Sequence, residues 1–336
     1  MGLESDDTND GLEDEAEDAS IPSSDSDFDS AGDAAERVVE RSPRGRFTRF
    51  NRRLGTGAFK TVYLAYDSDT GREVAWNVIP FKRLNRHARK QIDTEIKVAA
   101  ALDNPRILRF ISSWVNREKG EVIFITERIT GGSLWSYIRR LESPLKLKVI
   151  KMWCKQILEG LDYLHTHQPN PIIHRDLKCS NIFVNGGDAH VVIGDLGLCT
   201  TLLTDPATSL VGTPEFMAPE MYDEHYGTEI DIYAFGMCLL QMISRKLPFS
   251  ECSSAGQVYK KVIAGKQPHD VGRINNQELR EIVESCIDAN PEHRPTARTL
   301  LANPFWGRRE GGDQLITILK PDEPMYTSHS LSFTQV

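Results

Sequence analysis

Apolar and polar residues alternate along five short stretches between residues 47 and 126. The stretches are Phe47–Leu54, Thr61–Tyr66, Glu73–Ile79, Ile107–Trp114 and Val122–Thr126. Alternation with a period of two is typical of strands that bury one face. The turn-forming run Asp69-Thr70-Gly71 separates the second stretch from the third. The pattern therefore predicts a small β-rich region of five strands.

Helical periodicity dominates the rest of the chain, and one helix, Arg86–Leu102, is predicted among the strands. Ser133 is a suitable N-cap for a helix that runs to Leu141. Further helices are predicted at Leu145–His165, Gly227–Ser244, Gln257–Ile263, Gln277–Ile287 and Thr296–Leu301. The apolar run Tyr233–Ile243 is too short to cross a bilayer and is interpreted as a buried core helix. The predicted fold class is α+β.

Composition separates the ends of the chain from its middle. Residues 1–40 contain 15 acidic residues and one basic residue, whereas the remainder contains 39 basic and 33 acidic residues. Low hydrophobicity with a high net charge is typical of disorder. We therefore expect an acidic disordered tail at 1–45, a folded domain at 46–306 and a disordered C-terminal tail at 307–336. The acidic tail is either attracted to the basic domain or only solubilising, and composition leaves both open.

The spacing of cysteines and apolar residues disfavours several classes of protein. Six scattered cysteines without metal-like spacing are typical of reduced thiols in an intracellular protein. His165-Thr166-His167 is interpreted as an exposed helix end rather than a metal site. We expect a cytoplasmic protein with no membrane insertion and no nucleic-acid partner. Thr334-Gln335-Val336 resembles a C-terminal peptide that adds as a strand to a partner, an ending that also arises often by chance.

The stretch Leu54–Val62 resembles a glycine-rich phosphate loop with two irregularities. Gly55 and Gly57 allow the backbone to approach phosphates closely. Lys60 replaces the third glycine of G-x-G-x-x-G, and Asn77 replaces the lysine of a V-A-I-K strand. Neighbouring strands lie about 4.8 Å apart, so a lysine on one strand can reach the space left by a lysine on the next. The two irregularities together predict that the phosphate-binding cation has moved from position 77 to position 60.

Three motifs follow in the helical half, at His174–Asn181, Asp195–Gly197 and Gly212–Glu220. The patterns H-R-D-L-x-x-x-N, D-x-G and A-P-E in this order resemble a eukaryotic protein kinase. The resemblance runs from about Phe47 to Phe305. It implies a bilobal fold with a small β-rich N-lobe at 46–127, a hinge at about 128–132 and a larger, mainly helical C-lobe at 133–306. It also implies ATP and Mg²⁺ as cofactors, with Mn²⁺ able to substitute.

The kinase resemblance implies a role for each polar residue of these motifs. Asp176 accepts or orients the proton of the substrate hydroxyl, and Lys178 neutralises the γ-phosphate of ATP. Asn181 and Asp195 supply oxygen ligands for the metal. His174 is interpreted as a packed structural histidine rather than a general base.

A lysine in the glycine-rich loop, combined with a third strand that lacks one, resembles the WNK (with-no-lysine) kinases. The matching segments are Gly55–Tyr63, Val74–Asn77, Gly194–Leu198 and Gly212–Tyr222. The resemblance implies a Ser/Thr protein kinase in which Lys60 meets both the phosphates and Glu95. The expected nucleotide-binding residues are Gly55, Gly57, Lys60, Val62, Ala75, Glu95, Thr126 and Glu127.

The resemblance implies further sites. Ser209 matches the activation-loop serine that these kinases autophosphorylate, and a phosphate there would pair with Arg175. Glu220 and Arg294 resemble a buried ion pair, and Asp231 resembles the carboxylate that holds the catalytic-loop backbone. An inhibitory chloride beside Asp195 would contact an apolar wall, although packing explains the same residues equally well. The wall consists of Leu196, Leu198, Phe110 and Phe124, of which Phe124 is bulkier than expected.

Two other functions remain open from the sequence. A pseudokinase that binds nucleotide as a scaffold would have lost transfer with the lysine that Asn77 replaces. Against this alternative, the full set of Asp176, Lys178, Asn181 and Asp195 is present. A protein that acts mainly through its tails would depend on 1–45 or 307–336. The family resemblance favours protein substrates, including downstream kinases that control ion transport.

Overall fold

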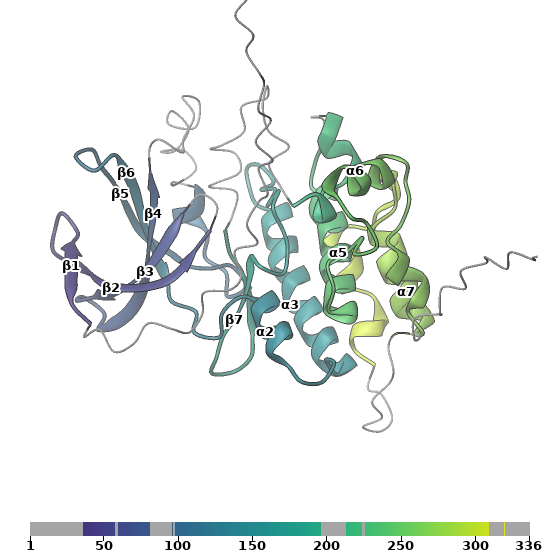
Figure 1. Cartoon of the computed structure of the whole chain (residues 1–336), viewed down its shortest axis with the longest axis horizontal. Coiled ribbons are helices and arrows are strands. Elements are labelled where there is room, and N and C mark those ends of the chain that lie inside the picture. The colour runs from purple at the N-terminus through teal and green to yellow at the C-terminus, as the bar shows by residue number, and fades with distance from the viewer. Residues whose placement is uncertain are drawn as a thin grey trace, which may run out of the picture. The chain divides into compact units, whose positions relative to one another are not determined.

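The computed structural model describes residues 36–57, 60–80, 96, 98–195, 213–223, 226–308 and 319 (Figure 1). The N-terminal part of this region is a β-sheet and the C-terminal part is mainly helical. The first 35 residues, almost all of the C-terminal tail and most of the predicted helix Arg86–Leu102 lie outside the described residues. Within the described ranges, no helix is long and apolar enough to cross a membrane.

Six antiparallel strands form one sheet in the order β1-β2-β3-β4-β6-β5. The strands are β1 (Val38–Arg41), β2 (Phe47–Thr56), β3 (Thr61–Asp67), β4 (Arg72–Pro80), β5 (Phe110–Asn116) and β6 (Glu121–Glu127). Strands β2 to β6 confirm the five predicted strands. β5 begins three residues later than expected, because Ile107 instead forms an isolated bridge with Ile193.

Strand β1 lies inside the segment expected to be disordered, so the predicted tail boundary at residue 45 is wrong. Arg41 of β1 pairs with Thr48 of β2. The turn between the two strands is held by Ser42, whose Oγ accepts the N–H of Phe47 at 2.9 Å. Gly45 supplies the positive φ of 75° that this turn requires. A polar run that resembles a linker in composition is therefore a hairpin turn.

One face of the sheet packs around Trp76. This cluster of buried residues contains Phe47, Ala65, Val74, Trp76, Val78, Ile123 and Ile125. Trp76 meets Trp114 edge-on, with ring centroids 4.8 Å apart. Successive side chains of a strand alternate between faces, so Ala75 and Asn77 lie on the opposite face of β4. They are buried as well, and this second face is the one that contributes to the candidate site.

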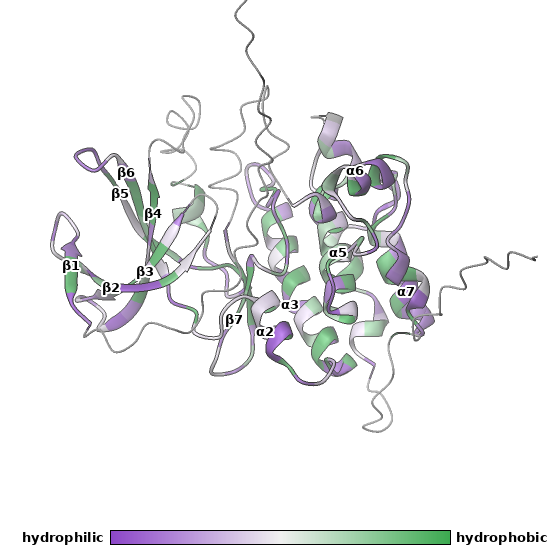
Figure 2. Cartoon of the chain, viewed as in Figure 1, coloured by the Kyte–Doolittle hydropathy of each residue, from purple (hydrophilic) through white to green (hydrophobic). Residues whose placement is uncertain are grey.

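The helices confirm the predicted helical segments to within two residues at each end. They are α2 (Leu134–Arg140), α3 (Leu147–His165), α5 (Glu229–Ser244), α6 (Ala255–Ile263), α7 (Gln277–Cys286) and α8 (Ala297–Leu301). Ser133 caps α2 as predicted, because its Oγ accepts the N–H of Ser136 at 3.1 Å. α5 is buried along nearly its whole length and packs against α3 and α7, and Figure 2 shows its apolar residues in green. This helix is the centre of the second core.

A short hairpin that the periodicity did not predict joins the two halves of the candidate site. Its strands are β7 (Ile182–Val184) and β8 (Val191–Ile193). β7 follows the loop 174–181 and β8 precedes Asp195. The hairpin therefore brings the H-R-D and D-x-G motifs together at one end.

Candidate active site

The loop His174–Asn181 is fastened to the helical core by Asp231, at the start of α5. The Asp231 carboxylate is 1% exposed and accepts the backbone N–H groups of His174 at 2.8 Å and Arg175 at 3.0 Å. Arg175 adopts a φ of 68°, which costs a non-glycine residue on the order of 1–2 kcal/mol. The geometry matches the role that the kinase resemblance implied for Asp231.

His174 connects this loop to the D-x-G motif. It is fully buried, and its Nδ1 accepts the N–H of Asp176 at 3.3 Å. Its Nε2 then carries the proton and donates to the carbonyl of Gly194 at 2.9 Å. Both ring nitrogens are thus engaged with the backbone, which supports the interpretation as a structural histidine. Gly194 also donates its N–H to the carbonyl of Asn181 at 2.8 Å.

Asp176 lies at the centre of a polar cluster. Its carboxylate accepts the Nδ2–H of Asn181 at 2.8 Å and lies 3.0 Å from Nζ of Lys178. Lys178 also donates to Oγ of Thr213 at 3.2 Å. The carboxylate, the cation and the amide that sequence analysis singled out therefore lie together. This grouping can orient a hydroxyl and neutralise a phosphate beside it.

Asp195 forms an ion pair with Lys60, the displaced lysine of the glycine-rich loop. The pair is partly buried, with 15% of the Lys60 side chain and 24% of the Asp195 side chain exposed. Nζ of Lys60 also lies 5.7 Å from the ring centroid of Phe124. A Cβ on Gly194 would lie 2.6 Å from the Phe183 ring, so only glycine fits before Asp195. The loop lysine thus reaches the D-x-G motif directly.

Strand register explains how Lys60 reaches this position. Asn77 pairs with Val62 of β3 on one side and with Phe124 of β6 on the other. Lys60 lies two residues before Val62, immediately before β3, and its side chain reaches Asp195 from there. The Asn77 side chain is 3% exposed and donates to Ala75 O at 3.3 Å. The strand position that carries lysine in a V-A-I-K motif is therefore filled by a buried neutral amide, as the displaced-lysine interpretation requires.

The remaining nucleotide-binding candidates belong to the same sheet. Gly55 lies on β2, Val62 on β3 and Ala75 on β4. Thr126 and Glu127 end β6. Oγ1 of Thr126 accepts from Asn77 at 3.4 Å, and Oε1 of Glu127 accepts the N–H of Arg109 at 2.8 Å. Gly57 donates its N–H to the Lys60 carbonyl at 2.8 Å, just before β3.

Four predicted site residues lie outside the described residues. They are Glu95, Leu196, Leu198 and Ser209. The two described residues of the expected chloride wall, Phe110 and Phe124, stack with centroids 6.2 Å apart and an interplanar angle of 11°. The C-terminal Thr334-Gln335-Val336 also lies outside.

The Glu220–Arg294 pair forms as the resemblance implied. Arg294 donates to both carboxylate oxygens of Glu220, at 2.5 and 2.9 Å, and its side chain has no exposed surface. It also donates to the carbonyls of Asp288 at 2.8 Å and Glu229 at 3.1 Å. The pair therefore ties the A-P-E motif to both the start of α5 and the segment before α8.

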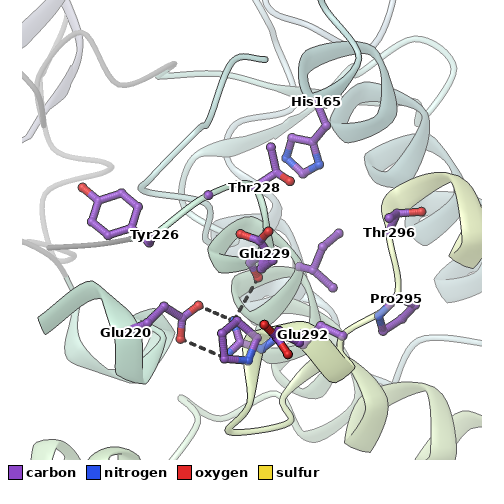
Figure 3. A pocket seen from close by; sticks show the side chains of 12 residues that line it. His165, Glu220, Tyr226, Thr228, Glu229, Glu292, Pro295 and Thr296 are labelled. Atoms are coloured by element: carbon purple, nitrogen blue, oxygen red, sulfur yellow. Dashed lines mark hydrogen bonds and ion pairs between the residues drawn. The ribbon is translucent and has the colours of Figure 1, made fainter. Parts of the chain in front are cut away.

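His165 corrects one sequence interpretation, because it is not an exposed helix end. Its side chain is 9% exposed, and its Nε2 lies 2.9 Å from the Asp231 carboxylate. Tyr226, which sequence analysis did not single out, has its ring 6.0 Å from the guanidinium carbon of Arg175. Both residues line a cavity of about 440 Å³ in the helical lobe (Figure 3). No local sequence pattern identifies these contacts, since they join residues far apart in the chain.

Comparison with known proteins gives the protein family and then the group within that family. The protein kinase domain family matches residues 48–306, so the chain belongs to the protein kinase family. Within that family it is similar to the WNK kinases, which confirms the resemblance noted in the glycine-rich loop.

Three relatives illustrate the similarity. The serine/threonine-protein kinase WNK3 of Mus musculus is 44% identical over 281 residues, which cover 83% of this chain and 16% of the relative. WNK4 of Homo sapiens is 43% identical, with coverage of 83% and 22%. WNK of Caenorhabditis elegans is 44% identical over 280 residues, with coverage of 82% and 15%. The matched region thus spans less than a quarter of each relative.

Proposed function

We propose that this chain is a Ser/Thr protein kinase of the WNK type that transfers the γ-phosphate of ATP to protein hydroxyls. The contact of Lys60 with Asp195, while Asn77 is buried and uncharged, carries the proposal. The glycine-rich loop supplies, through Lys60, the cation that β4 lacks at Asn77. A scaffold without transfer has no need to keep Asp176 and Lys178 beside this cation.

In this reaction the substrate hydroxyl oxygen bonds to the γ-phosphorus while the bond to the β–γ bridging oxygen breaks. ADP leaves with the electron pair of that bond, and Asp176 accepts the hydroxyl proton. Lys178, 3.0 Å from the Asp176 carboxylate, neutralises charge on the transferred group. Lys60 also neutralises charge on the phosphates, from the opposite lobe. Its side chain replaces the lysine that a V-A-I-K motif would place on β4.

Asn181 and Asp195 fit a divalent metal such as Mg²⁺. The Nδ2 group of Asn181 donates to the carbonyl and carboxylate of Asp176, both at 2.8 Å, so its amide oxygen is the atom left for a metal. Asp195 adds a carboxylate, and both are the hard oxygen donors that Mg²⁺ prefers. When bound there, the ion would supply positive charge that offsets the charge of the phosphates. On nucleotide binding, we expect the phosphates to replace Asp195 as the ion-pair partner of Lys60.

A radiometric transfer assay with MgATP and a protein substrate tests the proposal. We expect phosphoserine or phosphothreonine in the product and loss of both in Asp176→Asn. Nucleotide binding measured by calorimetry distinguishes the alternatives. MgATP binding by a chain that never transfers phosphate would overturn the kinase and favour the scaffold.

Regulation and partners follow from the same proposal. Ser209 is proposed as an autophosphorylation site whose phosphate pairs with Arg175. The proposed substrates are proteins, including downstream kinases in cytoplasmic signalling of ion or osmotic balance, and Thr334-Gln335-Val336 is proposed as a peptide that a partner binds. Mapping phosphosites by mass spectrometry after incubation with MgATP tests Ser209. Phosphate found elsewhere but never on Ser209 would overturn this assignment alone.

Chloride inhibition is proposed at a wall of Leu196, Leu198, Phe110 and Phe124. The stacked Phe110–Phe124 pair supplies an apolar surface next to Nζ of Lys60. Transfer measured at constant ionic strength, with chloride exchanged for gluconate, tests this. We expect the rate to fall as chloride rises. A rate independent of chloride would remove the anion site and leave the kinase assignment intact.

A further inference from the structure

The cavity of about 440 Å³ lies where the end of α3, the start of α5 and the segment before α8 meet (Figure 3). None of its lining residues is an expected catalytic, nucleotide-binding or metal-binding residue. Its volume lies within the range of small-molecule and side-chain pockets, about 300–1,000 Å³. Figure 3 shows His165 on one side of it and Glu220 on another.

The charge of the lining is unbalanced. Arg294 is neutralised by Glu220 through two hydrogen bonds. Glu229 and Glu292 also line the cavity. Across the described part of the chain, no ion pair involves either of these two carboxylates, of which Glu229 is half-buried and Glu292 is exposed. The cavity wall is therefore net negative.

Apolar and aromatic residues also line the cavity, together with His165, Thr228 and Thr296. Ile232, Pro291 and Pro295 supply aliphatic surface, and Tyr226 supplies a ring. Carboxylates bind guanidinium and ammonium groups through charge-assisted hydrogen bonds, and a tyrosine face attracts the same groups. Aliphatic surface next to them suits the carbon stem of such a group rather than a hydrated metal ion. The lining thus offers carboxylates for the charged head of an organic cation and aliphatic surface for its carbon stem.

We propose that this cavity binds an amphipathic organic cation, a guanidinium or ammonium group on a short apolar stem. An arginine or lysine side chain of a protein partner and a free amine of similar size share this chemistry. In either case the cationic head lies between Glu229 and Glu292, and the stem contacts Ile232 and the two prolines.

Two contacts connect the cavity to the catalytic loop. His165 lines the cavity and bonds to Asp231, which holds the backbone of His174 and Arg175. Tyr226 lines it and lies beneath the Arg175 guanidinium. A ligand that shifts either side chain therefore shifts a support of the loop that carries Asp176. The cavity is therefore a regulatory site. Its effect on phosphate transfer rests on the proposed kinase function, whereas the binding of the organic cation does not.

Calorimetric titration of the full chain with agmatine tests binding. We expect saturable binding at one site in the wild-type chain. In Glu229→Gln/Glu292→Gln the Kd rises about tenfold, because each carboxylate contributes a severalfold gain. The matched control is Glu118→Gln/Glu142→Gln, which removes two exposed carboxylates outside the cavity. Its Kd stays at the wild-type value.

The outcomes separate the site from general attraction to an acidic chain. Equal weakening in both double variants, or no saturable binding in the wild type, overturns the proposal. A parallel titration with the peptide Ac-Ala-Arg-Ala-NH₂ identifies the source of the cation. Tighter binding of the peptide assigns the cavity to a protein side chain, and tighter binding of agmatine assigns it to a free amine.

A kinetic measurement tests the regulatory effect. Saturating agmatine is expected to change kcat at least about twofold in the wild-type chain and not in Glu229→Gln/Glu292→Gln. Binding without any change in kcat would overturn the regulatory part. Binding by a chain that shows no transfer under any condition would overturn the kinase function and leave the cavity assignment standing.

Discussion

The two lobes hold the charges of the proposed catalytic site in different ways. In the helical lobe, the loop that carries Asp176 is fixed through its backbone by Asp231, a carboxylate that is 1% exposed. In the sheet lobe, Lys60 projects from the position just before β3 and meets Asp195 through the end of a long side chain. The contacts of Asp231 determine the backbone conformation of the loop. The contact of Lys60 only places an ammonium group next to Asp195.

This difference explains why one charge is displaced and the others are not. A lysine acts as a point charge on a flexible stem, so several strand positions can supply it. Arg175 and Asp195 instead adopt φ values of 68° and 56°, a conformation that surrounding contacts must maintain. The two motifs that contain these residues are therefore tied to fixed backbone positions and lack the freedom of a lysine side chain.

The largest expected effect tests the fixed lobe. Asp176→Asn removes the proposed proton acceptor at constant side-chain size, and its single amide oxygen can accept from Asn181 or from Lys178 but not from both. We expect kcat to fall about 10²–10⁴-fold, with the affinity for MgATP changed little. Steady-state transfer rates and calorimetry check the two parts. A variant with near wild-type kcat would remove Asp176 from the reaction.

The displaced lysine is tested next. Lys60→Met removes one preorganised cation and lowers kcat/KM about 10²–10³-fold. Asn77→Ala is the matched control on the neighbouring strand, and we expect less than about a fivefold change, because it removes only hydrogen bonds of 3.3–3.4 Å.

A second variant sharpens the comparison. If only the position of the charge matters, Lys60→Met/Asn77→Lys recovers part of the lost rate. Comparable losses in Lys60→Met and Asn77→Ala, or no loss in Lys60→Met, would contradict the displaced-cation account.

A stability effect of intermediate size comes from the Glu220–Arg294 pair. Glu220→Gln leaves the buried guanidinium without its counter-charge, and we expect a loss of about 2–3 kcal/mol, since the amide oxygen still accepts one hydrogen bond. Asp162→Asn, which breaks the exposed pair with Arg298, is the control and costs less than about 1 kcal/mol. Urea unfolding of each variant checks both values. Equal losses would show that burial of the pair does not matter.

Much of this arrangement is predictable from sequence, because it depends on residue type and local pattern. Alternation identified β2 to β6, and motif chemistry singled out Asp176, Asn181 and Lys60 as candidate site residues. Strand β1 was missed because its pairing with β2 depends on a turn, Ser42–Gly45, whose composition is that of a linker. The contact of His165 with Asp231 spans 66 positions and the Lys60–Asp195 pair spans 135. Such contacts arise only from packing of distant elements, and a sequence pattern does not encode them locally.

The smallest expected effect concerns the end of β3 opposite Lys60. The side-chain hydrogen bond from Arg46 holds the pKa of Asp67 at about 2, below its usual 3.8. Since the folded pKa is the lower one, the pair stabilises the fold above pH 4, and this stabilisation is lost as the pH falls from 4 toward 2. Arg46 is partly exposed, so we expect Asp67→Asn to cost about 1–2 kcal/mol at pH 7 and to flatten the acid limb of the stability profile. Asp188→Asn, an exposed carboxylate next to His190, leaves that limb unchanged. Urea unfolding from pH 2 to 7 measures both variants, and an unaltered acid limb in Asp67→Asn would show that this pair contributes nothing to the sheet lobe.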